Sequence, residues 1–194
     1  MKLHTLQNTD IYLLDQIFKD RFKKTDVILD AGCGSGRNLA WFIENNDTVF
    51  GVDTANEKIK QLQNHYPQLG QNFTVQALDN LSFTANTFHH IICNAVLHFA
   101  KNEVHFYKMF TELWRVLKPN GMLFIRMTSD IGIENKVKHI ADGVYQIPDG
   151  STRFLLTKKI LQTLKNQYSF TFLEPLKTVN VNDVRCMTTL VLQK

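Results

Sequence analysis

Apolar residues along this chain fall into two repeating patterns. Short, nearly continuous apolar runs predict buried strands, and longer stretches with apolar residues three or four positions apart predict helices. We expect strands near 27–30, 49–53, 73–77, 88–93 and 121–127, and helices near 37–45, 55–65 and 102–117. Because strand and helix alternate, the pattern predicts an α/β fold with a doubly wound, mostly parallel sheet and helices on both faces.

The N-terminal part precedes the first strand and has helical spacing of its own. Its apolar residues, with Asp10 able to cap the start, predict an amphipathic helix over 10–23. We expect the whole chain, 1–194, to form one domain in which the segment 1–24 covers the functional site.

The alternation of strand and helix breaks after Met127. Within 128–156, the turn signal Pro148-Asp149-Gly150 separates two short apolar segments, 144–147 and 152–155, which predicts a hairpin or an ordered loop. We expect 128–156 to be an insertion or lid. Beyond it, Thr157 can cap a further helix, and two strands are expected near 168–174 and 184–192.

Length and composition are those of one globular domain. The chain has 194 residues, of which 44% are hydrophobic and 21% charged, a balance that argues against disorder. No apolar run has the length of a membrane span and the first residues have no signal-peptide core, so we expect a cytoplasmic protein without membrane contact.

Cys33, Cys93 and Cys186 form no C-x-x-C pair, which favours reduced thiols over disulfides or a metal site. The net charge of +4 is mild, so we do not expect nucleic acid as a partner. The expected oligomeric state is a monomer or homodimer.

Residues 27–38, Val-Ile-Leu-Asp-Ala-Gly-Cys-Gly-Ser-Gly-Arg-Asn, carry the clearest chemistry. Gly32, Gly34 and Gly36 follow a buried strand and predict a tight turn close to a ligand, because glycine adopts positive φ at little cost and has no Cβ. The helix expected from Arg37 would direct its free N–H groups at the same ligand. A dinucleotide site has the spacing G-x-G-x-x-G, and here the third glycine comes one position early, with Arg37 in its place. The spacing therefore favours a small nucleoside-like ligand over NAD.

Four segments in order resemble the class I S-adenosyl-L-methionine (SAM) methyltransferases. Residues 30–36 match the family pattern E/D-x-G-x-G-x-G, and three later segments are similar to the second, fourth and fifth strand regions of the family: Val-Phe-Gly-Val-Asp at 49–53, Phe-His-His-Ile-Ile-Cys-Asn at 88–94, and Arg-Val-Leu-Lys-Pro-Asn-Gly-Met-Leu-Phe-Ile at 115–125. The resemblance implies a Rossmann-like sheet of seven strands whose last strand is antiparallel. It also implies SAM as the cofactor and S-adenosyl-L-homocysteine (SAH) as the product.

The resemblance places the cofactor at the carboxyl ends of the first strands. Asp53 would accept hydrogen bonds from the ribose hydroxyls, or would serve only as the N-cap of the following helix. Asp30 would bind the SAM ammonium, directly or through water, or would brace the amides of the glycine turn. At the adenine end Ala77 stands where the family has an acid, so Leu78 is expected to offer its backbone and Asp79 to accept from the exocyclic amine. The expected cofactor contacts are Asp30, Ala31, Gly32, Cys33, Gly34, Gly36, Asn38, Asp53, Thr54, Leu78, Asp79 and Asn94.

Methyl transfer from a sulfonium depends on positioning two reactants and excluding water, and it needs no metal. His98 follows the fourth strand and is the catalytic candidate: its neutral imidazole could take a proton from the acceptor or simply contact it. The alternative is a pocket-wall histidine without a proton role. Tyr12 and Arg126 are candidates to face the acceptor, and Arg153 and His139 to belong to a lid; a surface or bracing role is the alternative for each.

The resemblance extends most closely to the tellurite-resistance branch of small methyltransferases, in residues 36–38, 79–83 and 185–190. That branch has a histidine before its last strand, and residues 177–184 contain none, so its metalloid chemistry is not expected here. A small-molecule methyl acceptor is the leading expectation. The alternatives are methylation of RNA or protein, SAM binding without turnover, and a nicotinamide oxidoreductase with the same architecture.

Overall fold

The computed structural model describes residues 3–194 and is built on an eight-stranded sheet. The strands are β1 Val27–Ala31, β2 Thr48–Asp53, β3 Phe73–Val75, β4 Phe88–Asn94, β5 Leu117–Ser129, β9 Thr171–Phe172, β10 Lys177–Val181 and β11 Arg185–Gln193. Their order is β10-β11-β5-β4-β1-β2-β3, with the short β9 paired to β11. β1 to β5 are parallel, and β11 is antiparallel to β5. The expected mostly parallel sheet with an antiparallel last strand is confirmed, with one strand more than the seven expected.

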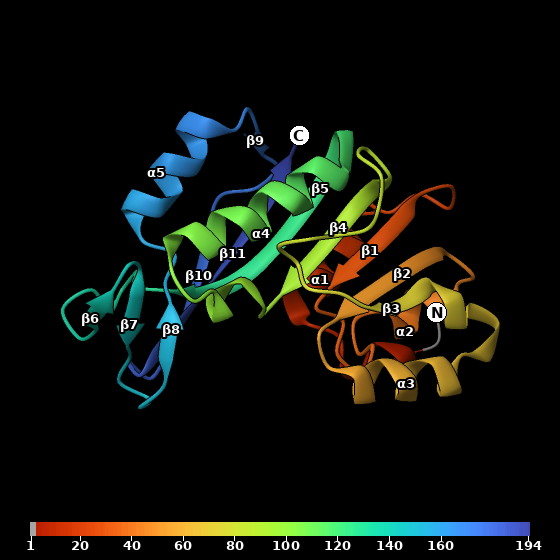
Figure 1. Ribbon diagram of the computed structural model, residues 1–194, viewed down its shortest axis with the longest axis horizontal. Helices are drawn as coiled ribbons and strands as arrows, with labels where there is room; N and C mark the ends of the chain where they lie inside the picture. The colour runs from red at the N-terminus through yellow and green to blue at the C-terminus, as the bar shows by residue number, and fades with distance from the viewer. Residues whose placement is uncertain (1–2) are drawn as a thin grey trace.

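Helices cover both faces of the sheet. They are α1 Ile11–Phe18, α2 Ala40–Glu44, α3 Asn56–His65, α4 Glu103–Val116 and α5 Lys158–Gln167, with short 3₁₀ turns η1 Leu3–Leu6, η2 Pro67–Asn72 and η3 Leu97–Phe99. Figure 1 shows α4 and α5 in front of the sheet and α1 and α2 behind it. Side chains alternate between two apolar cores along each strand: Ile91 and Cys93 of β4 join the core with α4, and Ile92 joins the core with α1 and α2.

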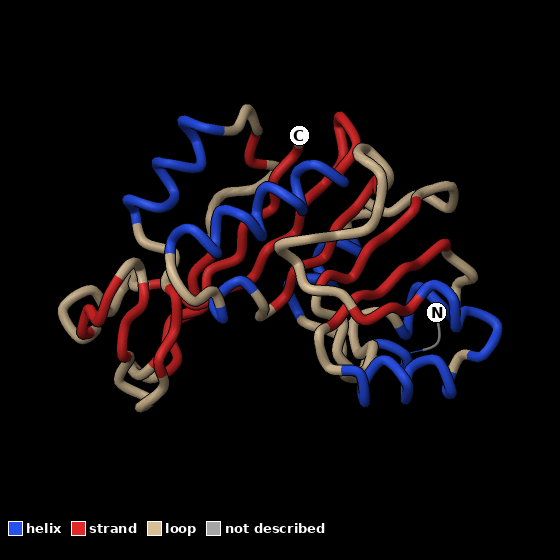
Figure 2. The backbone as a smooth tube through the Cα atoms, viewed as in Figure 1, coloured by secondary structure: helices blue, strands red, loops and turns tan. Residues whose placement is uncertain are grey.

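The segment after β5 forms a small antiparallel sheet of its own, β6 Lys138–Ala141, β7 Val144–Gln146 and β8 Thr152–Phe154. It lies apart from the main sheet at the left of Figure 2. Phe154 anchors it, because its ring stacks on Phe106 of α4 with the centroids 4.6 Å apart. The expected hairpin is confirmed as the β7–β8 pair. β6 was not expected, because its four residues are all exposed and show no apolar alternation.

Three predicted elements are longer in the sequence pattern than in the structure. The helix expected over 37–45 is confined to α2, because Gly34 and Gly36 have φ of +55° and +81° and the chain turns before it can become helical. The helix after the glycine turn therefore begins at Ala40, four residues after Gly36, and not at Arg37 as expected. The N-terminal helix ends at Phe18, just before Asp20 with φ of +53°. The strand expected over 168–174 is reduced to β9, and the edge strand β10 was missed.

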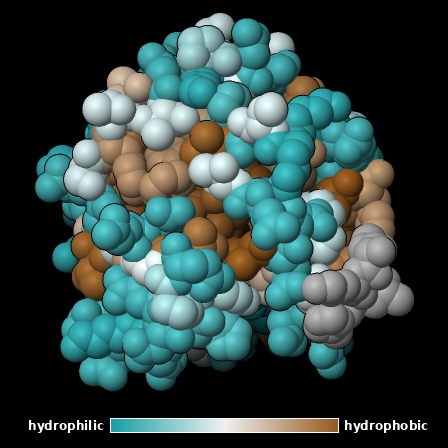
Figure 3. Space-filling view, turned by 90° about the vertical axis from the view of Figure 1, so that its right-hand side faces the viewer, coloured by the Kyte–Doolittle hydropathy of each residue, from teal (hydrophilic) through white to brown (hydrophobic). Residues whose placement is uncertain are grey.

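The surface on the α3 and β3 side of the molecule is hollowed. Figure 3 shows apolar residues in the middle of this face, surrounded by polar ones. Among residues 3–194, no helix has the length and apolar character that would let it cross a membrane.

Candidate active site

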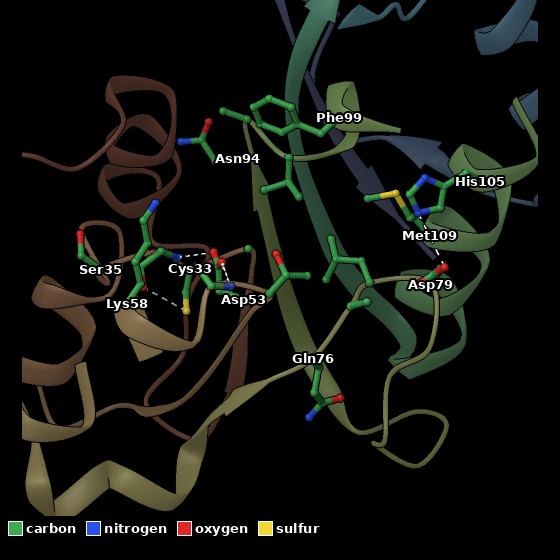
Figure 4. Close-up of a pocket in the computed structure, with 18 of the residues that line it drawn as sticks. Cys33, Ser35, Asp53, Lys58, Gln76, Asp79, Asn94, Phe99, His105 and Met109 are labelled. Carbon is green, nitrogen blue, oxygen red and sulfur yellow. Dashed lines mark hydrogen bonds and ion pairs between the residues drawn. The ribbon is translucent and has the colours of Figure 1, made fainter. Parts of the chain in front are cut away.

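A cavity of about 750 Å³ lies at the carboxyl edge of the parallel strands. β1 lies between β2 and β4, so strand order reverses there and the loops after β1 and β4 diverge, which is where open α/β sheets bind ligands. The volume is within the range of roughly 300–1,000 Å³ typical of small-molecule sites. The wall is formed by Gly32, Cys33, Gly34, Ser35, Arg37, Asp53, Thr54, Ala55, Lys58, Gln76, Ala77, Leu78, Asp79, Asn94, Ala95, Val96, Phe99, Lys101, His105 and Met109. Figure 4 shows the loops that carry these residues converging on the cavity.

The glycines of the loop after β1 serve different purposes. A Cβ at Gly32 would lie 2.3 Å from Cγ2 of Val96, and one at Gly36 would lie 2.5 Å from Cδ1 of Leu62. These two glycines let the loop pack closely against its neighbours. Gly34, with φ of +55°, has no other side chain or backbone atom nearer than 3.9 Å to such a Cβ, so it provides the turn at an open part of the wall.

Asp53, at the end of β2, holds the glycine loop in place. The amide of Gly34 donates to Oδ2 of Asp53 at 2.8 Å, and the amide of Ala55 donates to Oδ1 at 2.9 Å. Since α3 begins at Asn56, these bonds precede the helix and Asp53 is not its N-cap. Each carboxylate oxygen keeps a second lone pair for a ligand in the cavity.

Two buried polar side chains beside the cavity have no hydrogen-bond partner among residues 3–194. Both carboxylate oxygens of Asp30 and both side-chain polar atoms of Asn94 are unpartnered, although Asp30 is only 1% exposed. Burial raises the pKa of Asp30 to about 7, against the attraction of Arg37 and with added repulsion from Asp53. The alternative in which Asp30 braces amides of the glycine turn is therefore wrong. Unpartnered buried groups are rare in folded proteins, and these two suit a charged ligand.

The loop after β3 forms the other end of the cavity. Leu78 and Asp79 reach the wall together with Gln76, as Figure 4 shows for the two polar residues. Oδ2 of Asp79 lies 3.7 Å from Nε2 of His105. The structure thus brings the two residues expected at the adenine end into one cavity with Asp53.

Comparison with known proteins identifies the family. A protein-family model described as "Methyltransferase domain" matches residues 29–125, half of the chain. The chain belongs to this methyltransferase family. The match spans the glycine loop, Asp53 and the strands that carry the cavity, so it confirms the methyltransferase class expected from the sequence.

Individual proteins that are similar to this chain are also named as methyltransferases. The probable methyltransferase ltbC of Aspergillus luteorubrus is 32% identical over 117 residues, which are 55% of this chain and 41% of that protein, so the chain spans about two fifths of its curated relative. A SAM-dependent methyltransferase of Methanosarcina mazei superposes with a TM-score of 0.71 at 21% identity, over 92% of this chain and 96% of that one. The 1,6-didemethyltoxoflavin-N1-methyltransferase of Burkholderia thailandensis, solved with bound 1,6-didemethyltoxoflavin and SAH, superposes with a TM-score of 0.67 at 18% identity, over 98% of this chain and 78% of that one. Both structures share the fold.

Some residues expected to touch the cofactor lie behind the cavity wall of the methyltransferase. Asp30, Ala31, Gly36 and Asn38 are not among the lining residues. Oδ1 of Asn38 accepts a hydrogen bond from the amide of Asp10 at 3.2 Å, which ties the start of α1 to the loop. Gly36 lines a second, smaller cavity of about 340 Å³ between α2 and α3. The other expected contacts, Gly32, Cys33, Gly34, Asp53, Thr54, Leu78, Asp79 and Asn94, all reach the main cavity.

His98 is buried and also lies outside the cavity lining. Its Nδ1 lies 3.1 Å from Oγ1 of Thr128 and 3.3 Å from the amide of that residue. Burial, and secondly the charges of Arg153 and Arg185, lower the pKa of His98 to about 4. The imidazole is therefore neutral near pH 7, and it packs against the ring of Phe99 with the centroids 4.5 Å apart.

Lys58, Phe99, His105 and Met109 line the cavity and were not expected from the sequence. Lys58 lies in the first turn of α3, five residues after Asp53 at the end of β2. This closeness to Asp53 along the chain is the sequence signal that could have identified it. Phe99 lies in η3 after β4, and His105 and Met109 lie one turn apart on α4, so whether they face the cavity depends on how these two elements pack.

None of the four residues expected to face the acceptor or to belong to a lid is part of the cavity lining. The guanidinium of Arg126, next to Asn94 in register, lies 5.2 Å from the ring centroid of Tyr12. Arg153 lies over the ring of Phe99 at 5.0 Å. His139 packs on Tyr145 in the small sheet. The covering role of 1–24 and the lid role of 128–156 stay predictions.

Proposed function

We propose that the protein transfers the methyl group of SAM to a small-molecule acceptor. The observation that carries the proposal is the carboxylate of Asp53, fixed against the glycine loop at the cavity wall. Its free lone pairs suit the two ribose hydroxyls of an adenosyl group. The unpartnered side chain of Asn94, which lines the cavity, suits the charged groups of an amino acid, and Asp30 behind the wall would reach the ammonium through water. SAM contains both parts.

The residues of the cavity would orient SAM from one end to the other. Leu78 and Asp79 meet the adenine, Asp53 the ribose, and Asn94 the amino-acid part. When bound, SAM would supply a methyl group on a positively charged sulfur, which would keep the electron pair of the broken bond while a lone pair of the acceptor bonds to the methyl carbon. The protein contributes alignment of the two molecules and exclusion of water. A role of His98 as proton acceptor or acceptor contact stays a proposal, and the support for it is that its neutral ring, itself outside the lining, packs against Phe99 at the cavity wall.

Three observations support a small acceptor. The cavity is of small-molecule size. The Burkholderia neighbour is named for methylation of a small compound, 1,6-didemethyltoxoflavin. The resemblance of residues 79–83 and 185–190 to the tellurite-resistance branch points the same way, while metalloid chemistry is not part of the proposal. A cytoplasmic location and a monomeric or homodimeric state stay predictions of the sequence.

The test is calorimetric titration of the purified protein with SAH and, separately, with NAD. We expect saturable binding of SAH and none of NAD. Asp53→Asn should weaken SAH binding about 10-fold or more, because a hydrogen bond to a charged group contributes roughly 1.5–3 kcal/mol. The exposed Asp142→Asn is the matched control and should bind SAH as the wild type does.

A second measurement separates turnover from binding. Isotope-labelled SAM is incubated with the protein and with fractionated small metabolites, RNA or protein in parallel, and the labelled product is identified. Label in the small-molecule fraction is the expected result. Binding of NAD in place of SAH would overturn the proposal, and binding of SAH without any labelled product would favour a non-enzymatic SAM-binding protein.

A further inference from the structure

The cavity has an end that the expected contacts of the adenosyl group leave free. Figure 4 places Gln76 and Asp79 toward one end and Asn94 and Phe99 toward the other, with Asp53 between them. If the adenine occupies the first end and the ribose lies at Asp53, the reactive sulfur points toward the second. The acceptor must then approach from the side of Phe99.

Phe99 is an unusual residue for a protein surface. It lines the cavity and is still 59% exposed, although large aromatic side chains are normally buried. It follows β4 in η3, next to the buried His98, so its backbone is held in place while its ring remains open to a ligand. An exposed ring at the mouth of a cavity offers a stacking surface to a planar molecule.

Arg153 of β8 gives this surface a charge. Its guanidinium lies 5.0 Å from the ring centroid of Phe99, and its one hydrogen bond goes to its own neighbour, the carbonyl of Thr152. Within residues 3–194, no carboxylate lies at ion-pair distance from Arg153; the nearby Asp149 pairs with Arg185 instead. A guanidinium has five N–H donors, so most of its capacity to bind a carboxylate is unused.

The lining of the cavity carries more cationic side chains than carboxylates. Arg37, Lys58 and Lys101 line it without an ion pair to any described residue. Of the lining carboxylates, Asp53 is bound to two amides and Asp79 lies beside His105. SAM carries a net positive charge, so its binding adds to the excess of positive charge in the cavity. An acceptor with a negative charge is the electrostatic complement of this site.

We propose that Phe99 and Arg153 form the acceptor subsite and that the acceptor is an aromatic carboxylate. The aromatic ring packs against Phe99 and the carboxylate pairs with Arg153. The small sheet β6–β7–β8 thereby contributes a binding residue to a cavity that is otherwise lined by the loops and helices at the edge of the main sheet. This inference rests on the proposed function, since it takes the remainder of the cavity to hold SAM or SAH.

The test uses protein saturated with SAH and a panel of benzoate, salicylate, 4-hydroxybenzoate, cinnamate and indole-3-acetate, each paired with its neutral amide. Calorimetry should detect at least one acid that binds about 10-fold or more tightly than its amide, as expected for a charge-assisted pair. Arg153→Gln should abolish this preference, and Phe99→Ala should weaken acid and amide alike. Lys165→Gln removes the cation of a similar pair with Phe172 in another part of the molecule and should change neither.

The outcomes separate the two proposals. Both site variants should keep the SAH affinity and the melting temperature of the wild type, because neither residue is an expected SAH contact. If SAH binds but no acid of the panel is preferred over its amide, or if Arg153→Gln keeps the preference, the acceptor assignment is wrong and the proposed function stands. If SAH itself does not bind, the proposed function fails first.

Discussion

Asp30 makes the stability of the ligand-free protein depend on pH. Burial without a hydrogen-bond donor raises the pKa of this carboxyl to about 7, from an ordinary value of 3.8. Between about pH 4 and pH 7 the folded state keeps a proton that the unfolded state has released. The free energy of unfolding therefore falls as the pH rises through this window, and the full loss is present above about pH 7.

Asp30→Asn should remove this dependence, because the amide has nearly the same shape and no charge. The unfolding free energy of the variant minus that of the wild type should therefore grow by a few kcal/mol when the pH is raised from about 5 to about 8, since one unit of pKa shift corresponds to 1.36 kcal/mol. Urea unfolding of the SAH-free proteins at both pH values measures the gain. Asp142→Asn, at an exposed turn, should show a constant difference from the wild type, and the same constancy for Asp30→Asn would contradict the interpretation.

At the scale of elements, the glycine loop combines conformation and packing in one segment. Gly32 and Gly34 both have positive φ, but only Gly32 also needs the missing Cβ, because Val96 fills that space. The loop is tied from two sides, by Asp53 of β2 and, through Asn38, by the start of α1.

Alanine substitutions should separate the two requirements. Gly34→Ala should cost about 1–2 kcal/mol of unfolding free energy, the cost of a left-handed conformation with a side chain. Gly32→Ala should cost more, because the added Cβ would lie 2.3 Å from Cγ2 of Val96, and a short valine cannot move away without a backbone shift. Gly150→Ala, with φ of +84° and no atom within 4 Å, is the control for conformation alone. Equal losses for Gly32→Ala and Gly150→Ala in thermal unfolding would contradict the packing role of Gly32.

The strands that the sequence predicted most closely are those with buried apolar runs. β1, β2, β4 and β5 were all predicted near their observed places, since their residues are covered on both faces. β10 was missed because it is a half-exposed strand at the edge of the sheet, where polar residues are tolerated. The helix expected over 37–45 is shorter in the structure, because helical spacing does not reveal the positive φ of Gly34 and Gly36 just before it.

At the scale of the whole molecule, Glu174 joins the two ends of the chain. It lies between β9 and β10, and its carboxylate accepts hydrogen bonds from Gln16, Lys19, Arg21 and Lys177. Burial alone would raise the pKa of this group, but these donors lower it to about 2. Its contribution to stability is therefore fully present above the ordinary value of 4.5 and is lost as the pH falls through about 2.

Glu174→Gln should lower the unfolding free energy at pH 7 by about 1–3 kcal/mol, because several cations lose a common charged partner while some of them stay in contact with water. Urea unfolding measures the loss. Glu57→Gln, at an exposed position in the first turn of α3, should stay within about 0.5 kcal/mol of the wild type. A Glu174 variant as stable as that control would show that the network does not hold α1 in place.

Much of the candidate site could be predicted from the sequence, because several of its residues lie directly at the ends of predicted strands. Gly32 and Gly34 act through their backbone conformation and Asp53 through bonds to nearby backbone amides. All three lie at strand ends, so their order along the chain is enough to place them. Phe99 and Arg153 come together from a loop and a separate sheet, and Glu174 meets α1 from the far end of the chain. No local pattern contains these contacts, because they depend on how the two sheets and the helices pack.

The position of β11 also bears on how the protein is made. This strand pairs along β5 from Met122 to Ser129 and separates it from β10. While the ribosome is still adding residues 185–193, β5 has an unpaired edge rich in apolar residues, of the kind that joins other chains. Nascent chains that stall before this point would be prone to aggregate, and chaperones that shield strand edges would be needed most during the synthesis of β11.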